Sequence, residues 1–326
     1  MKYTYLGRSG LRVSRLCLGT AAFGSFSGGS KEYGGVSEAD SFQIMDAALD
    51  AGINFFDTAN VYGGVGSRGR TEEIIGNWFA QGGDRRARVV LGTKVGRVFE
   101  QDEIDGPNKQ EGLSLYKIRR HFEASLRRLR TDHIELYQMH HAYPHVTWDE
   151  LWEAFEGLVR QGRVDYIGSC NFGAADLMEA QHTARDRRFM GLVSEQSRYN
   201  LVDRAAEREL IPTAAKLGIG VTVWSPMARG LLALDVTRPL PTALSGDARN
   251  LLVTHRERMR EFSALCRELG ESEATVAIAW LLANPAITSP VIGPGSVEEL
   301  HSMLRATEID LDSETMKRLD AIFPGA

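Results

Sequence analysis

The sequence predicts a (β/α)8 barrel, with residues 1–326 forming one domain. Eight short apolar runs alternate with longer amphipathic stretches, at roughly one run per 40 residues. Strict alternation indicates a parallel sheet covered by helices, and eight units favour a closed barrel. The alternative, an open doubly wound sheet, predicts a G-x-G-x-x-G turn after its first strand. The first run is followed instead by Gly19-Thr20-Ala21-Ala22-Phe23-Gly24.

The expected strands are short, and most are rich in β-branched or aromatic residues. They cover residues 16–18, 53–56, 89–91, 134–139, 164–167, 192–193, 219–224 and 289–292. A hairpin is expected before the first strand, with arms at 2–6 and 11–14 and a turn between them. This hairpin is placed where it could close the floor of the barrel.

The helices are indicated by apolar spacing and by their end signals. Between residues 115 and 129 the apolar positions lie 3, 4, 4 and 3 residues apart, which marks one face of a helix, and residues 151–159 repeat the pattern. Ser37 has the character of an N-cap. Three glycines lie between a helix pattern and the following strand, where a C′ glycine belongs: Gly52, Gly162 and Gly218.

Four polar or glycine-rich loops each follow an expected strand, so they should lie on the C-terminal rim of the barrel. They comprise residues 25–35, 63–69, 99–112 and 235–250.

Composition excludes several classes of protein. The formal net charge is −5, so no basic excess indicates a nucleic-acid partner. The three cysteines are far apart without a C-x-x-C, and no histidine pair comes with the carboxylates of a metal motif, so neither disulfides nor a metal site is expected. The chain shows neither the apolar run of a signal peptide nor one of about 18 residues that could span a membrane. The expected location is the cytoplasm; the oligomeric state is open.

Three polar residues end apolar runs and are candidates for catalysis: Asp57, Lys94 and His140. They are 37 and 46 residues apart, each close to one β/α repeat, so they should lie side by side on neighbouring strands. Strand parity places Asp57 and His140 on the apolar faces of their strands, with Gln138 on the same face as His140. His141 should point to the opposite face, which makes it the weaker candidate.

Tyr62 lies five residues after Asp57, in a loop that can fold back over the barrel mouth. A phenol has a pKa near 10, and a lysine cation within hydrogen-bond reach is expected to lower it. Asp57 would keep Lys94 charged and aimed, which makes Tyr62 a candidate general acid. His140 could orient a substrate carbonyl oxygen or help to relay the proton. Taken singly, each residue is more often a cap, a solvated side chain or a structural histidine; their conjunction at matched strand ends favours chemistry.

The residues at these positions resemble the aldo-keto reductase family over nearly the whole chain. The resemblance rests on the following stretches: Gly19-Thr20, Asn54-Phe55-Phe56-Asp57-Thr58-Ala59, Tyr62-Gly63, Thr71-Glu72, Thr93-Lys94, Leu136-Tyr137-Gln138-Met139-His140, Gly168 with Asn171-Phe172, Gln196 with Tyr199-Asn200, and Trp224-Ser225-Pro226. The family's catalytic tetrad then falls on Asp57, Tyr62, Lys94 and His140.

The resemblance implies an extended nicotinamide cofactor bound across the barrel mouth, NADP(H) by the family's habit, with NAD(H) as the alternative. Trp224 would stack on the nicotinamide, and Asn171 and Gln196 would hold its carboxamide. The pyrophosphate would follow 225–231, and residues 293–296 would approach the adenosine phosphate. The implied cofactor contacts are Gly19, Thr20, Asp57, Cys170, Asn171, Gln196, Trp224, Ser225, Met227, Arg229, Gly230, Leu231, Gly293, Gly295, Ser296 and Glu299.

Several positions depart from the family pattern. Cys170 stands where the family commonly has Ser, and Gly295 where an Arg for the 2′-phosphate is expected. Glu299 and Met303 replace an expected Gln and Asn, and a glutamate there would repel a phosphate. These departures weaken the expectation of NADP(H), and Arg229 or Arg249 are the candidates to compensate.

The sequence therefore predicts an oxidoreductase that reduces the carbonyl of a small molecule. The Gln138-Met139-His140-His141 strand end and the Phe323-Pro324-Gly325 tail resemble a bacterial branch of the family. That branch includes reductases of nucleotide-linked deoxysugars, so an aldehyde, ketone or sugar derivative is the expected substrate. Two alternatives remain: reduction of an activated C=C in such a sugar, and a cofactor-sensing subunit resembling potassium-channel β-subunits, which the intact tetrad disfavours.

Overall fold

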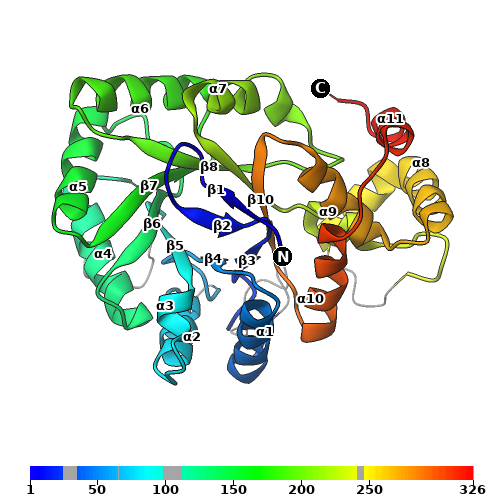
Figure 1. Cartoon of the computed structure of the whole chain (residues 1–326), viewed down its shortest axis with the longest axis horizontal. Coiled ribbons are helices and arrows are strands. Elements are labelled where there is room, and N and C mark those ends of the chain that lie inside the picture. Colours follow the sequence, from blue (N-terminus) through cyan, green and yellow to red (C-terminus); the bar gives the residue numbers. More distant parts are fainter. Residues whose placement is uncertain (25–34, 65, 98–111, 241–245, 326) are drawn as a thin grey trace.

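The computed structural model describes residues 1–24, 35–64, 66–97, 112–240 and 246–325. Eight parallel strands close into a barrel in the order β10-β3-β4-β5-β6-β7-β8-β9. Helices surround the barrel on the outside (Figure 1). The predicted (β/α)8 fold is therefore confirmed.

Each barrel strand lies at one of the eight predicted runs. The strands are β3 (Cys17–Gly19), β4 (Phe55–Asp57), β5 (Val90–Val95), β6 (Ile134–Met139), β7 (Val164–Cys170), β8 (Leu192–Arg198), β9 (Gly220–Trp224) and β10 (Ile287–Ile292). The prediction ended β7 and β8 too early. Both strands continue toward the mouth through polar residues such as Ser169 and Glu195, which are buried and hydrogen-bonded to each other. An apolar pattern cannot reveal a strand of that kind.

The helices begin and end largely where the sequence signals them. They are α1 (Glu38–Asp50), α2 (Arg70–Phe79), α3 (Arg85–Arg88), α4 (Leu115–Leu129), α5 (Trp148–Arg160), α6 (Ala174–Asp186), α7 (Leu210–Leu217), α8 (Gly246–Leu269), α9 (Glu273–Ala283), α10 (Val297–Leu304) and α11 (Ser313–Ile322), with short 3-10 turns η2 (Ala205–Glu207), η3 (Ala228–Ala233) and η4 (Arg305–Thr307). Ser37 caps α1 by accepting from the Asp40 N–H, and Gly218 ends α7 in the left-handed conformation.

The predicted rim loops meet different outcomes. The loop at 235–250 is wrong at its C-terminal end, because α8 begins at Gly246. Loops 25–35 and 99–112 lie almost entirely outside the described residues.

The N-terminal hairpin is formed by β1 (Tyr3–Tyr5) and β2 (Arg12–Ser14), which pair antiparallel. It lies across one end of the barrel (Figure 1). Leu6 and Val13 are fully buried in a cluster with Phe55 and other barrel residues. Gly7 has φ +56°, and a Cβ there would lie 2.4 Å from the Val193 carbonyl oxygen. The hairpin therefore packs its backbone directly onto the strand starts, which confirms the predicted cap.

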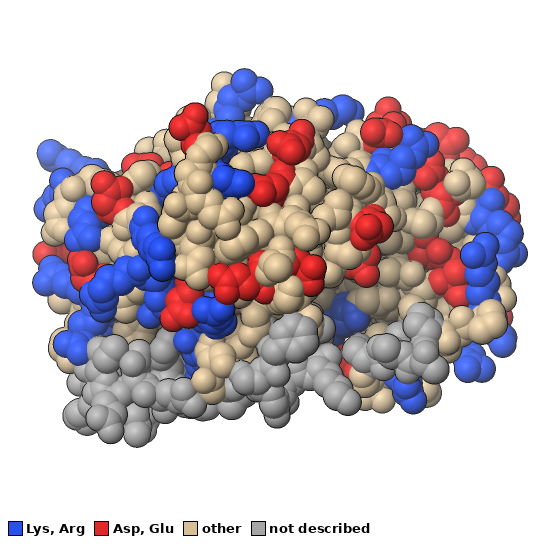
Figure 2. Space-filling view, turned by 90° about the horizontal axis from the view of Figure 1, so that it is seen from below, with Lys and Arg blue, Asp and Glu red and all other residues tan. Residues whose placement is uncertain are grey.

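The surface carries charges of both signs. Figure 2 shows one face on which Lys and Arg side chains are interspersed with Asp and Glu, and the whole chain has 38 of the former kind and 43 of the latter. Among the described residues, no helix is both long enough and apolar enough to cross a membrane.

Candidate active site

The barrel mouth contains a buried ion pair between Lys94 and Asp57. Asp57 ends β4 and Lys94 lies on β5, and the side chains of these two residues are nearly inaccessible to solvent. Lys94 Nζ lies 2.5 Å from Asp57 Oδ2 and donates to the Thr58 carbonyl oxygen at 3.0 Å. A buried lysine stays charged only with such partners. The expected side-by-side placement of Asp57 and Lys94 is what the structure has.

Asp57 is also held by two glutamine amides that fill the barrel interior. Gln138 Nε2 donates to Asp57 Oδ1 at 3.0 Å, and Gln196 Nε2 donates to the same oxygen at 2.9 Å. Glycines on the flanking strands leave room for Gln138: a Cβ at Gly168 would lie 3.1 Å from Gln138 Cγ. The sequence indicated that Gln138 shares a strand face with His140, but it did not identify Gln138 as a partner of Asp57.

Tyr62 lies over this pair. Its hydroxyl is 3.3 Å from Lys94 Nζ, and the same Nζ lies 5.1 Å from the centre of the phenol ring. The loop is anchored by the Tyr62 backbone carbonyl, which accepts from the Gly69 N–H at 2.9 Å. The phenol, the lysine and the carboxylate therefore form one connected chain.

The acidity of Tyr62 differs from the sequence expectation. Burial raises the pKa of Tyr62 to about 12; Lys94 lowers it, but not enough to offset burial and the Asp57 carboxylate. For Lys94, burial lowers the pKa, yet Asp57 and Tyr62 together leave it above the ordinary value. Lys94 thus lowers the pKa of the phenol as the sequence predicts, but burial outweighs its effect. Tyr62 is protonated and Lys94 is charged at neutral pH.

His140 completes the group at the end of β6. It is 6% exposed, and its ring meets the Tyr62 ring edge-on at a centroid distance of 6.0 Å. Burial, and then the cations Lys94 and Arg97, hold the pKa of His140 well below its ordinary value. The imidazole is neutral, and its Nδ1 has no hydrogen-bond partner among the described residues. A neutral imidazole can donate one N–H to a ligand but is no source of a labile proton.

The prediction that His141 points away from His140 is wrong. The two rings stack 5.2 Å apart with an interplanar angle of 2°. β6 ends at Met139, so the rule that successive side chains of a strand point to opposite faces applies to neither histidine.

Asn171 joins His140 to Trp224. Its Nδ2 donates to the His140 carbonyl oxygen at 3.1 Å, and its Oδ1 accepts from Trp224 Nε1 at 3.0 Å. Cys170, the preceding residue, is buried, and Asn171 Nδ2 lies 3.1 Å from its Sγ. Burial raises the Cys170 pKa, so the thiol is neutral.

The chain after Trp224 forms a cradle of left-handed residues beside a cavity. Ser225, Ala228, Arg229 and Gly230 all have positive φ. Ser225, Ala228 and Arg229 line a cavity of about 440 Å³, together with other residues that include Arg198, Arg204, Asp203 and Asp247. The arginines are paired: Arg229 with Asp247, Arg198 with Asp203, and Arg204 with Glu207.

The remaining expected cofactor residues fall into two groups. At the strand ends, Gly19 and Thr20 are buried, and Thr20 Oγ1 donates to the Asp57 carbonyl oxygen at 3.0 Å. Leu231 is fully buried in the core, so only its backbone can face the cradle, while Met227 is partly exposed.

The start of α10 is already occupied by a carboxylate. Ser296 caps the helix, and Glu299 Oε2 accepts from the Gly295 N–H at 2.8 Å. Gly293 and Gly295 are exposed. Two arginines were expected to replace the missing contact to the 2′-phosphate. Arg249 is exposed on α8, and Arg229 forms an ion pair with Asp247.

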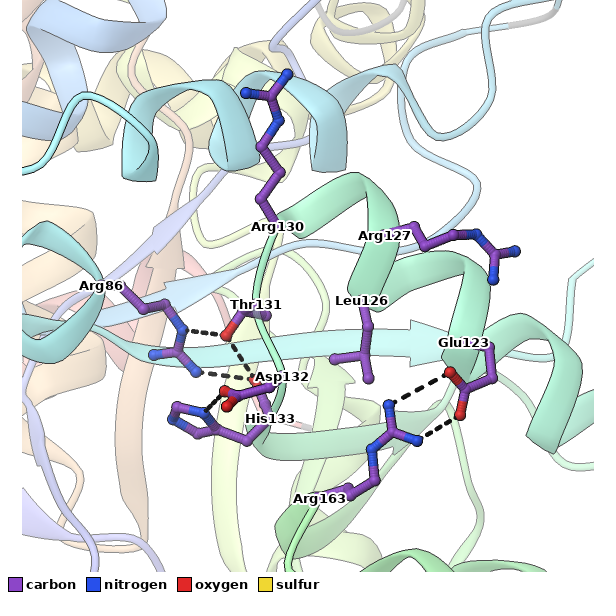
Figure 3. Close-up of a pocket in the computed structure, with 9 residues that line it drawn as sticks. All are labelled: Arg86, Glu123, Leu126, Arg127, Arg130, Thr131, Asp132, His133 and Arg163. Atoms are coloured by element: carbon purple, nitrogen blue, oxygen red, sulfur yellow. Dashed lines mark hydrogen bonds and ion pairs between the residues drawn. The ribbon is translucent and has the colours of Figure 1, made fainter.

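A second surface hollow, of about 620 Å³, is unrelated to this group (Figure 3). Thr131 and His133 line it just before β6 begins, whereas His140 follows the end of that strand. The hollow thus lies at the opposite end of the barrel. Arg163 is held there by Glu123, and Arg86 by Thr131 and the His133 carbonyl oxygen.

Comparisons with known proteins agree with this geometry. A sequence profile of the aldo/keto reductase family matches residues 15–323. The chain is 55% identical to the uncharacterized oxidoreductase YrpG of Bacillus subtilis (strain 168), over 100% of this chain and 97% of the relative. It is 34% identical to a putative aryl-alcohol dehydrogenase of Schizosaccharomyces pombe (98% and 94%) and 30% identical to a putative voltage-gated potassium channel subunit beta of the same yeast (98% and 92%). The chain belongs to the aldo/keto reductase family.

Proposed function

We propose that this protein reduces an aldehyde or ketone with a reduced nicotinamide dinucleotide, using Tyr62 as the general acid. The observation that carries the proposal is the chain of contacts from Asp57 through Lys94 to the Tyr62 hydroxyl. Family membership supports an oxidoreductase of this general kind.

The bound nicotinamide would supply the hydride, and the protein's residues handle the proton. Tyr62 donates its hydroxyl proton to the carbonyl oxygen as negative charge develops there. Lys94 stabilises the phenolate that forms, because it is cationic and 3.3 Å away. Asp57 keeps Lys94 charged, and neutral His140 is suited to donate an N–H to the same carbonyl oxygen.

The described residues fit such a cofactor. Trp224 is partly exposed and its ring is fixed by Asn171, so it offers a flat surface beside the tetrad. The cavity beside 225–230 suits a diphosphate because three arginines line it: Arg198, Arg204 and Arg229. The backbone N–H groups of residues 228–230 donate within the turn itself and hold its shape. We place the nicotinamide at Trp224 and the diphosphate along 225–230.

The preference between NADP(H) and NAD(H) is proposed to be small. NADP(H) is the family's habit, but Glu299 places a carboxylate at the start of α10, where the resemblance puts the adenosine 2′-phosphate. Like charges close together disfavour binding. Glu299→Gln should therefore tighten NADPH binding several-fold and leave NADH binding nearly unchanged. Equal changes for both cofactors would remove Glu299 from this role.

The substrate class is best approached with three probes: an aromatic aldehyde, a ketosugar and an enone. The first follows from the aryl-alcohol dehydrogenase name of one relative, and the second from the deoxysugar branch. We favour C=O reduction over C=C reduction because Tyr62 is positioned to protonate an oxygen held beside Lys94 and His140. Faster reduction of the enone than of both carbonyl probes would favour the alternative.

The test of the central proposal is Tyr62→Phe. Loss of the general acid should lower kcat/KM by about 10²- to 10⁴-fold while NADPH still binds. Tyr5→Phe is the matched control, because Tyr5 is exposed on the hairpin at the far end of the barrel. Full turnover in Tyr62→Phe would refute the role. If the unaltered protein binds the cofactor but turns over none of the probes, a cofactor-sensing subunit would be favoured instead, as the potassium-channel name of one relative suggests.

A further inference from the structure

Glu195 is a buried acid that takes no part in the proton chain described above. It lies on β8 and is 0% exposed. Its Oε1 accepts from the Phe172 N–H at 3.1 Å and from Ser197 Oγ at 2.7 Å, and its Oε2 accepts from Ser169 Oγ. Burying a carboxyl group costs free energy unless hydrogen bonds compensate, and these three donors provide the compensation. The role of the buried acid itself remains to be explained.

The Phe172 N–H belongs to a tight turn. Asn171 has φ +62°, in the left-handed region that Asn tolerates better than most L-residues. The Asn171 N–H donates to the Gln196 carbonyl oxygen at 3.0 Å, next to Glu195 in the chain. Two residues further along, the Gly173 N–H donates to Asp176 Oδ2 at 2.8 Å. The turn is therefore held at successive N–H groups by β8 and by the start of α6.

The side chain of Asn171 carries this conformation to the active site. One end of the amide holds the His140 carbonyl oxygen and the other holds the Trp224 indole. Any loosening of the 171–173 turn must change how firmly both residues are placed. Both belong to the proposed catalytic and cofactor site.

We propose that Glu195 is a positioning residue, whose carboxyl group fixes the Asn171–Phe172 turn and so makes nicotinamide binding at Trp224 depend on whether Glu195 is ionised. The inference rests on the proposed cofactor site. It assigns Glu195 no contact with substrate or cofactor.

The two charge states of Glu195 satisfy its donors differently. Ionised, the group accepts from all three, and the bond from the Phe172 N–H is charge-assisted and strong. Neutral, the group must donate its own proton, and a serine hydroxyl can turn to accept it whereas a backbone N–H cannot. The neutral form therefore weakens the hold on the turn but leaves it folded.

The groups around Glu195 leave its charge state free to change near neutral pH. Burial raises the pKa of Glu195 to about 7, although the hydroxyls of Ser169 and Ser197 and the Phe172 N–H lower it. The titratable neighbours are the neutral thiol of Cys170 on β7 and the carboxyl of Asp176 on α6. On β9, the register partner of Glu195 is Val221, which carries no charge. In the tetrad itself, the pKa values of Tyr62 and Lys94 lie far above 7 and that of His140 well below its ordinary value.

The experiment is a titration of the full-length protein with NADH from pH 5.5 to 8.5, followed by quenching of tryptophan fluorescence. NADH is used because NADPH carries a phosphate monoester that itself titrates near pH 6. The dissociation constant should fall about fivefold as pH rises through 7, which is the gain expected when one hydrogen bond becomes charge-assisted. A dissociation constant that stays flat over this range would overturn the proposal.

Two variants separate positioning from mere packing. Glu195→Gln cannot ionise, so its NADH dissociation constant should lose the inflection near pH 7. Ser197→Ala removes a donor that lowers the Glu195 pKa, so the inflection should move to higher pH. Asp176→Asn, at the other N–H of the turn, is the control and should leave the inflection where it is.

The outcomes distinguish this inference from the proposed function. Absence of any quenching by NADH or NADPH in the unaltered protein would contradict the cofactor site itself. Quenching with the same inflection in Glu195→Gln, or an unmoved inflection in Ser197→Ala, would contradict only the role of Glu195. If Glu195→Gln does not fold, as judged by circular dichroism, the direction of the Ser197→Ala shift decides alone.

Discussion

Replacing Asp57 by Asn should cost the fold more than replacing its partner Lys94 by Met, although both changes break the same ion pair. The reason is an asymmetry in what remains. Asp57→Asn leaves Lys94 fully buried with a carbonyl and a phenol oxygen but no counter-ion. Stranding a buried charge costs about 3–5 kcal/mol. Lys94→Met leaves Asp57 with the amides of Gln138 and Gln196, and each hydrogen bond to a charged group contributes about 1.5–3 kcal/mol. We therefore expect a loss of about 4 kcal/mol for Asp57→Asn and about 2 kcal/mol for Lys94→Met.

The measurement is urea denaturation at pH 7, followed by circular dichroism. The double variant Asp57→Asn/Lys94→Met should be close to Lys94→Met alone, since it strands no charge. Equal losses for Lys94→Met and Asp57→Asn, or a loss in the double variant equal to the sum of the two, would contradict the stranding of the Lys94 charge.

Two further predictions concern the interior of the barrel. The pKa of Glu195 is raised to about 7 in the folded protein, from an ordinary value near 4.5. Its contribution to stability is therefore full below about pH 4.5 and is lost as pH rises through 7, by about 3 kcal/mol in total. Denaturation at pH 5 and pH 8 should show that Glu195→Gln lacks this pH-dependent contribution, and an equal difference in stability between the two proteins at both pH values would contradict it. Gly168→Ala should destabilise the protein by about 1–3 kcal/mol, because the added Cβ would lie 2.5 Å from Ser194 Oγ. Gly157→Ala on α5 should stabilise it by up to about 1 kcal/mol, because the added Cβ would meet only Arg119 Nη2, 3.9 Å away. Thermal melts of both variants should show the opposite signs.

The sequence was informative where chemistry coincides with a repeating pattern. Asp57, Lys94 and His140 end apolar runs one repeat apart, and parallel strands then dictate that their ends meet at one rim. The register agrees: Asp57 pairs with Gly92 on β5, two residues before Lys94. Tyr62 could be added because a loop of five residues cannot carry it far from that rim.

The sequence was uninformative where burial is decided by the tertiary structure. A glutamate in a polar stretch is ordinarily exposed, so nothing at Glu195 announced a buried carboxyl group. Its burial depends on Ser169 and Ser197, which are equally unremarkable in sequence. The pKa of Tyr62 depends on how completely the surrounding side chains exclude water, and the sequence does not specify this. The stacking of His141 on His140 depends on where β6 ends, a boundary that apolar spacing leaves uncertain.

The hairpin at residues 3–14 has a consequence for the order of kinetic events. It covers the end of the barrel opposite the tetrad, with the Gly7 N–H and Cα against Gly220 and the Arg8 N–H donating to the Gly218 carbonyl oxygen. The hairpin therefore leaves the mouth as the way to Asp57 and Lys94 in the part of the chain that the structure describes. On the proposed function, cofactor and carbonyl substrate would share that entrance. Whichever of the two lies deeper would have to bind first and leave last, so a covered floor would favour an ordered sequence of binding and release.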